Sequence, residues 1–251
     1  MKLSLRVIGV LTLTVGVFFS PSVVIANDQA KAEADTEAEA AGVVVVVRKK
    51  IIDYNSIKPL QNPRYERSEK IVKRRVTDRK NKVIGEVKDV LFNKGGKVKS
   101  IYVDFDRLNL RKSVYLNHDT LDIFSTTSGY RLALNSDEVE DFYPKMLSSI
   151  EAASGDAGDA DRHKLYSLNK VLGSAVIDSD GRSIGKLEDI LFDSDGAYVR
   201  SAYLSISFRT IHNKGVAVPL SILEFEEKFG KSQIIIDKSY IAPILEMARE
   251  D

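Results

Sequence analysis

The chain repeats part of its own sequence at a spacing of one hundred residues. Between 76–96 and 176–196, eight of the twenty-one positions are identical. Self-similarity at a fixed spacing marks a structural unit that occurs more than once. The 251-residue chain is therefore predicted to contain the same small domain twice, at 68–148 and at 166–251.

Each copy has the sequence pattern of short β-strands joined by tight turns. Asp178 and Gly181 mark a turn between two strands, since Asp accepts hydrogen bonds from nearby N–H groups and Gly tolerates a positive φ. Gly85 and Gly185 lie inside strand-like sequence, which suits a bulge or the close approach of another backbone. A later strand alternates, and its apolar face is expected to consist of Ala202, Leu204, Ile206 and Phe208.

Two further strands and a helix complete each copy. The strands are expected at 113–116 and 130–134 in the first copy, and at 216–218 and 233–236 in the second. A short helix follows in each, opened by Asn135 or Asp237 as its capping residue. The predicted fold class is all-β, with two small barrels in tandem, each closed by a short C-terminal helix.

The second copy carries a motif that can be compared with known domains. Its members are Asp178, Gly181, Ile184, Gly185, Asp189, Phe192, Asp193, Gly196 and the run Val-Ala-Val-Pro at 216–219. This pattern resembles the PRC-barrel domain, which occurs in the H subunit of the photosynthetic reaction centre and in a ribosome maturation factor that binds a small-subunit protein. The first copy departs from the pattern at Asn81 and Asn117. The resemblance implies a small barrel that acts as a protein-binding adaptor, and it implies no catalytic residues.

The N-terminus has the features of an export signal. Lys2 and Arg6 precede an uncharged apolar stretch, and Ala26 ends a site of the kind that signal peptidase cleaves. Residues 1–26 are therefore predicted to be a signal peptide that is removed after Ala26, which makes the protein exported and periplasmic. The alternative is an uncleaved membrane anchor, because 7–26 is about long enough to span a bilayer.

The segment 27–67 is predicted to be flexible and charged, with a possible strand at 43–52. It begins with an acidic, alanine-rich stretch that has little apolar content. Val43–Val47 is an unbroken β-branched run, which favours a strand. An exposed strand of this kind would be expected to pair with a domain edge or a partner. A second segment, 149–165, is rich in Ala, Gly and Asp and is predicted to be a linker between the copies.

Positive charge is concentrated before and inside the first copy. Residues 48–82 contain thirteen Lys and Arg against four Asp and Glu, although the whole chain has a formal charge of only +1. One interpretation is a solvated linker that balances the acidic spacer. The other is contact with an anionic membrane surface.

Metal and nucleophile motifs are incomplete in this sequence. The chain has no cysteine, which excludes disulfides, thiolate nucleophiles and Cys-ligated zinc. The histidines are scattered, at His118, His163 and His212. Asp178, Asp180 and Asp189 fit three positions of a calcium loop, but Arg182 and Ser183 stand where that loop needs an oxygen ligand and a glycine. The two Ser-x-x-Lys matches, at 167–170 and 183–186, lack the motifs that accompany them in enzymes.

These observations predict no catalytic residue, no metal ligand and no cofactor site. The expected function is that of a non-enzymatic, exported PRC-barrel protein that acts as a protein-binding or scaffold module of the cell envelope, with a protein partner of unknown identity. The alternative is a membrane-associated accessory subunit, held at the bilayer by its hydrophobic and basic N-terminal segment. Nucleic acid is not an expected partner, because the two copies are nearly neutral.

Overall fold

The computed structural model describes residues 42–108, 113–118, 122–141, 165–228 and 231–250. The predicted signal peptide at 1–26, the acidic spacer up to residue 41 and the predicted linker from 149 to 164 lie outside these residues. From Val44 onward the chain forms one unit. Within the described ranges no helix is both long and apolar enough to cross a membrane.

Two sheets of seven strands each make up the fold. The N-terminal sheet consists of β2 (Arg75–Thr77), β3 (Val83–Phe92), β4 (Val98–Asp104), β5 (Ser113–Asn117), β6 (Phe124–Thr126), β7 (Gly129–Arg131) and β8 (Tyr166–Ser167). The C-terminal sheet consists of β1 (Tyr65–Arg67), β9 (Ala175–Asp178), β10 (Ser183–Asp193), β11 (Val199–Phe208), β12 (Ile211–Val218), β13 (Leu223–Lys228) and β14 (Lys231–Ile236).

The two sheets share one internal order of strands. Backbone pairing runs β5-β4-β3-β2-β7-β6 in one and β12-β11-β10-β9-β14-β13 in the other, so every strand has a counterpart. The β2–β7 and β9–β14 pairs are parallel, and the remaining pairs are antiparallel. A mostly β fold with two sheets is thus confirmed. Within the described residues neither path joins its two end strands, so closed barrels are not among the observed pairings.

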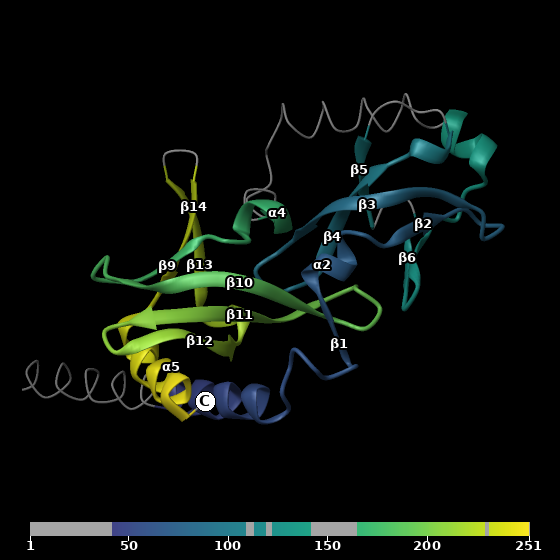
Figure 1. Ribbon diagram of the computed structural model, residues 1–251. Helices are drawn as coiled ribbons and strands as arrows, with labels where there is room; N and C mark the ends of the chain where they lie inside the picture. The colour runs from purple at the N-terminus through teal and green to yellow at the C-terminus, as the bar shows by residue number, and fades with distance from the viewer. Residues whose placement is uncertain (1–41, 109–112, 119–121, 142–164, 229–230, 251) are drawn as a thin grey trace, which may run out of the picture. The chain divides into compact units, whose positions relative to one another are not determined.

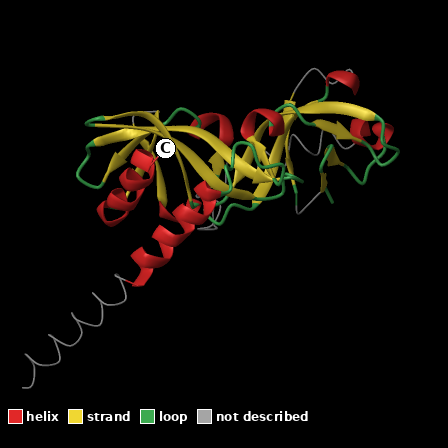
Figure 2. Cartoon of the chain, turned by 60° about the horizontal axis from the view of Figure 1, so that its bottom comes forward, coloured by secondary structure: helices red, strands yellow, loops and turns green. Residues whose placement is uncertain are grey.

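Helices are short segments between and beside the strands (Figure 2). They are α2 (Ser68–Ile71), α4 (Leu168–Val171), α5 (Lys238–Glu250), the 3-10 turns η1 (Asp106–Leu108) and η3 (Leu220–Ile222), and the helical residues 42–56 and 136–141. Helices begin directly after Asn135 and after Asp237, as predicted.

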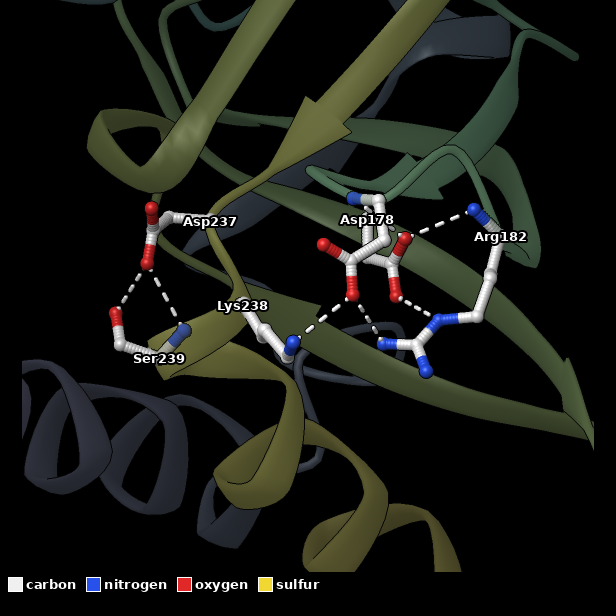
Figure 3. Close-up of polar contacts among 6 residues, drawn as sticks. Asp178, Arg182, Asp237, Lys238 and Ser239 are labelled. Carbon is white, nitrogen blue, oxygen red and sulfur yellow. Dashed lines mark hydrogen bonds and ion pairs between the residues drawn. The ribbon is translucent and has the colours of Figure 1, made fainter.

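The turn between β9 and β10 depends on Asp178. One carboxylate oxygen accepts the backbone N–H groups of Asp180 and Arg182, at 3.0 and 2.8 Å, and the other accepts Nε of Arg182 at 2.7 Å (Figure 3). Burial would raise the pKa of Asp178, but the hydrogen bonds and charge of Arg182 outweigh it and lower the pKa. Gly181 adopts the expected positive φ of 79°. The predicted turn is confirmed, and the oxygens that a calcium loop would use are engaged by N–H donors.

The predicted alternation of β11 matches its burial, with two exceptions. Ala202, Leu204 and Ile206 are fully buried, whereas Phe208 is partly buried. Ser205, expected on the solvent side, is also buried. On the neighbouring strand, a Cβ on Gly185 would overlap the carbonyl oxygen of Ser205. Gly185 therefore allows β10 to approach β11 closely, and Gly85 has the same role against Asp104, whose oxygen would lie 2.5 Å from an added Cβ.

The predicted strand at 43–52 is wrong, because residues 42–56 are helical. Val47 and Ile51 are buried, while Val45, Val46 and Ile52 are 67, 56 and 43% exposed. This one-sided burial has helical spacing. Helix propensities of ordinary residues differ by at most about 0.7 kcal/mol, whereas burying a Val or Ile side chain contributes about 1.5–3 kcal/mol. Packing therefore decides the conformation of the valine run.

This helix covers the exposed edge of β12. Asn55 donates to the carbonyl of Ala217 and accepts its N–H, both at 2.9 Å, which satisfies the backbone that an edge strand leaves unpaired. On the same helix Arg48 forms a 2.7 Å ion pair with Glu246 of α5. The contact with the β12 edge is therefore made by an amide side chain of a helix, not by the strand pairing that was predicted for 43–52.

We expect Ile51→Ala to lower the free energy of unfolding by about 2–5 kcal/mol, because a fully buried side chain would leave a cavity. Ile52→Ala removes the same atoms from the exposed neighbouring position and should change it by less than about 0.5 kcal/mol. Urea unfolding of the full chain followed by circular dichroism measures both. Equal effects would contradict the helical packing.

Candidate functional site

The two sheets exchange one short strand each. β1 comes directly before the N-terminal sheet in sequence, yet it pairs antiparallel with β10, with Arg67 opposite Leu191. β8 comes directly before the C-terminal sheet and pairs antiparallel with β3, with Ser167 opposite Leu91. Figure 1 shows the blue β1 leading into α2 beside the green β10. Each sheet is therefore completed by a strand that precedes the other sheet.

A buried aspartate receives the exchanged segment in the C-terminal sheet. Asp189 is 2% exposed. One of its oxygens accepts Nε of Arg67 at 2.6 Å, and the other accepts the N–H of Ser68 at 3.0 Å and its hydroxyl. The hydrogen bond to Asp189 raises the pKa of Arg67. Charge-assisted hydrogen bonds of this kind are about twice as strong as neutral ones.

Asp89 has the equivalent position in the N-terminal sheet. Its carboxylate accepts the hydroxyl of Ser167 at 2.6 Å and the N–H of Asn169 at 3.0 Å. The hydroxyl of Tyr115 donates at 3.3 Å, and burial together with the charge of Asp89 raises the pKa of Tyr115 to about 12. In the N-terminal sheet, the donors that bind the aspartate next to β8 are therefore all neutral. In the C-terminal sheet, one of the donors next to β1 is the guanidinium of Arg67.

Both aspartates also stabilise an irregularity in their own strand. The pairing register shifts between residues 87 and 89 of β3 and between 187 and 189 of β10. Asp89 accepts the N–H of Val90 and Asp189 that of Ile190, each at 2.8 Å. A bulge leaves a backbone group outside the ladder, and here the side chain supplies its partner.

The β3–β4 and β10–β11 turns add a second connection between the sheets. Lys97 and Tyr198 form an antiparallel bridge, supported by Val98 N–H to Ala197 at 3.0 Å and Val199 N–H to Gly96 at 2.7 Å. Hydrogen bonds of backbone to backbone therefore continue from one sheet to the other.

Arg74 and Tyr130 fasten the N-terminal sheet to the β10–β11 turn. Arg74 is buried and donates to the carbonyl oxygens of Ser194, Asp195 and Thr126. The Tyr130 hydroxyl donates to Gly196 at 2.9 Å, and burial raises the pKa of this phenol. Gly196 has a φ of 78°, and a Cβ there would lie 2.6 Å from Nη1 of Arg74.

A hollow lined by cations lies beside Arg74. Its volume is about 680 Å³. It is lined by Lys70, Lys73, Arg74, Arg75, Thr77, Asn81, Val83, Thr126, Ser128 and Arg131. We call it the cationic hollow. Its basic members at 70–75 come from the predicted basic segment 48–82, and the β6–β7 hairpin brings Arg131 to them.

The residues weighed for metal or nucleophile chemistry do not converge. His118 packs edge-on against Tyr130, with ring centroids 5.8 Å apart, whereas His212 is exposed on β12, and His163 lies outside the described residues. The part of the chain that the structure describes contains no group of three or more His, Asp and Glu able to hold a metal ion. Ser167 donates to Asp89 and caps α4 by accepting the N–H of Lys170, which is a structural use of that Ser-x-x-Lys match.

Sequence reasoning missed the role of the two aspartates. The carboxylates of Asp89 and Asp189 receive the exchanged strands, a role that the sequence analysis did not assign to them. The presence of these aspartates at the same place in both copies, directly before the apolar runs 90–92 and 190–192, was the available signal, since a buried carboxylate requires donors.

Comparison with known proteins bears on the second half of the chain. Residues 163–241 match the family model of the PRC-barrel domain. Among curated proteins, none matches the chain. The matched region contains β8 through β14 and the first residues of α5, so it includes the strand that is exchanged into the N-terminal sheet.

We expect Asp189→Asn to lower the free energy of unfolding by about 2–3 kcal/mol, because an amide NH₂ would face the donor Nε of Arg67 in a buried site. Glu188→Gln, the same change at the exposed neighbouring position, should cost less than about 0.5 kcal/mol. Urea unfolding of both full-length variants measures the difference. If the two variants unfold at the same urea concentration, the aspartate does not hold the exchanged strand.

Proposed function

We propose that this chain is an exported, non-catalytic binding protein in which two PRC barrels in tandem, each closed by a short C-terminal helix, form one platform for a protein partner of the cell envelope. The observation that carries the proposal is the reciprocal strand exchange. Each sheet holds a strand of the other through a buried carboxylate, at Asp89 and at Asp189. Two domains that only needed a tether would not require this connection.

Other observations support parts of the proposal. The PRC-barrel match at 163–241 supports the barrel for the second copy, and the shared strand order supports it for the first. The family resemblance supports an adaptor role. Export rests on the signal-like sequence of residues 1–26. The non-catalytic role rests on the incomplete motifs of the sequence.

An aromatic and basic surface at the junction is the best candidate for partner contact. Tyr198 is 41% exposed, and the guanidinium of Arg200 lies 5.5 Å from the centre of its ring. Arg200 is also held at 2.8 Å by Asp193, which pairs with Tyr65 of the exchanged strand. Tyr and Arg are enriched at the positions that dominate binding energy in protein interfaces. The exchanged strand thus pairs with the residue that positions Arg200, so the strand exchange supports this surface.

Capture from solubilised envelopes, with the tagged full-length chain as bait, tests the proposed function. We expect one saturable partner, bound about tenfold more weakly by Tyr198→Ala, since loss of a dominant side chain removes at least about 1.4 kcal/mol. Phe124→Ala removes an aromatic ring of the other sheet that is 51% exposed, and this variant should bind as the unchanged chain does. Equal weakening by both variants, or no saturable partner, would contradict the platform.

Export is tested separately on the same protein. Protein recovered from the periplasm should begin at Asn27, because cleavage is expected after Ala26. An N-terminus at Met1 would overturn the cleavage and favour the membrane-anchored alternative.

A further inference from the structure

The cationic hollow has positive charges that form no ion pair within the described residues, although the guanidinium of Arg131 lies 5.7 Å from the centre of the Phe124 ring. Arg74 is buried and bonds to three carbonyl oxygens, and Lys70 lies 3.5 Å from Glu66. Lys73, Arg75 and Arg131 are exposed, and none of them forms an ion pair with an acidic side chain of the described residues. Three cations therefore face one space without a carboxylate to neutralise them.

The strand register explains why these side chains gather. β2 and β7 run parallel, with Arg75 opposite Gly129 and Thr77 opposite Arg131. Residues that alternate along neighbouring strands point to the same face of a sheet, so Arg75, Thr77 and Arg131 share one face. Gly129 permits the close contact, since a Cβ there would overlap the carbonyl oxygen of Arg75.

The acidic side chain nearest in register is engaged elsewhere. Glu86 of β3 stands opposite Arg75, but its carboxylate lies 2.8 Å from Nζ of Lys88. This ion pair raises the pKa of Lys88. Arg75 consequently faces the hollow with its charge available.

The C-terminal sheet provides an internal comparison. There, Ala175 stands opposite Gln233 and Ile177 opposite Ile235, in the same parallel pairing of β9 with β14. Ala175, Ile177 and Ile235 thus occupy the positions of Arg75, Thr77 and Arg131. The same backbone is built without any of these cations, so folding does not require them.

We propose that the cationic hollow binds a ligand through its phosphate groups. Guanidinium groups pair with phosphate oxygens through two parallel hydrogen bonds, and Arg75 and Arg131 lie on adjacent strands. The hydroxyl of Thr77 lines the same space and can donate to a further oxygen. Thr126 and Ser128 also line it, but Thr126 donates to the carbonyl of Gly129 at 2.8 Å and Ser128 lies 3.2 Å from the Thr126 hydroxyl. A volume of about 680 Å³ lies in the range of small-ligand sites and exceeds the need of a bare ion.

Phosphate of this kind can come from a phospholipid head group or from a soluble phosphorylated compound. The chemistry of recognition is shared, because both present phosphate oxygens. The lining of the hollow includes neither Tyr198 nor Arg200, so different variants test the two proposals and either can fail without the other.

The test measures binding of the full-length chain to vesicles of phosphatidylglycerol with phosphatidylcholine, and to inorganic pyrophosphate, at low ionic strength. We expect saturable binding to at least one probe, weakened about tenfold by Arg75→Gln combined with Arg131→Gln. Lys170→Gln combined with Lys186→Gln removes two exposed charges from the C-terminal half and should leave the affinity unchanged. Circular dichroism and urea unfolding of each variant establish that it remains folded.

The two probes distinguish the sources. Binding to the anionic vesicles that pyrophosphate does not displace identifies a lipid head group, whereas tight binding of pyrophosphate identifies a soluble ligand. Equal loss in the two double variants would show general charge attraction, which salt screens, and would overturn the proposal. Absence of binding to both probes would overturn it as well.

Discussion

The structure depends on two buried carboxylates and the chain segments that satisfy them. Asp89 and Asp189 are 4 and 2% exposed, and each accepts four hydrogen bonds from the described residues. A buried carboxylate without donors costs several kcal/mol, so each sheet requires the segment that arrives from before the other one. The mutual dependence of the two sheets follows from this local electrostatic requirement.

The C-terminal sheet also depends on the helix at 42–56, which covers its edge strand β12. β12 ends the pairing path of the C-terminal sheet, and its backbone at Ala217 is satisfied by Asn55. The exposed hydrogen-bonding groups of an edge strand invite pairing with other chains. The helix at 42–56 therefore helps to prevent the edge of this sheet from pairing with other chains. It also contributes packing energy through its buried residues Val47 and Ile51.

The sequence predicted features that depend on neighbouring or repeated residues, and it missed strand pairs between segments that are far apart in the chain. The Asp178 turn and the alternation of Ala202, Leu204 and Ile206 were recovered because they depend on neighbouring residues. β1 and β8 are only three and two residues long and pair with strands more than seventy residues away, so periodicity carries no signal for them. The strand prediction for Val43–Val47 was wrong although its signal was local, because side-chain burial outweighed the β-propensity of the valines. The sequence showed the basic segment 48–82 but not the cationic hollow, because Arg131 joins it only through the β2–β7 register.

The strand exchange explains how two similar sheets can differ in chemistry. Both the exchange and the pairing between the turns are made largely by backbone groups and by the two aspartates, which the copies share. Outward-facing positions of β2, β7, β9 and β14 take no part in these contacts. They are therefore free to carry cations in one copy, at Arg75 and Arg131, and apolar side chains in the other, at Ala175 and Ile235. A frame held largely by its backbone can thus present two different surfaces.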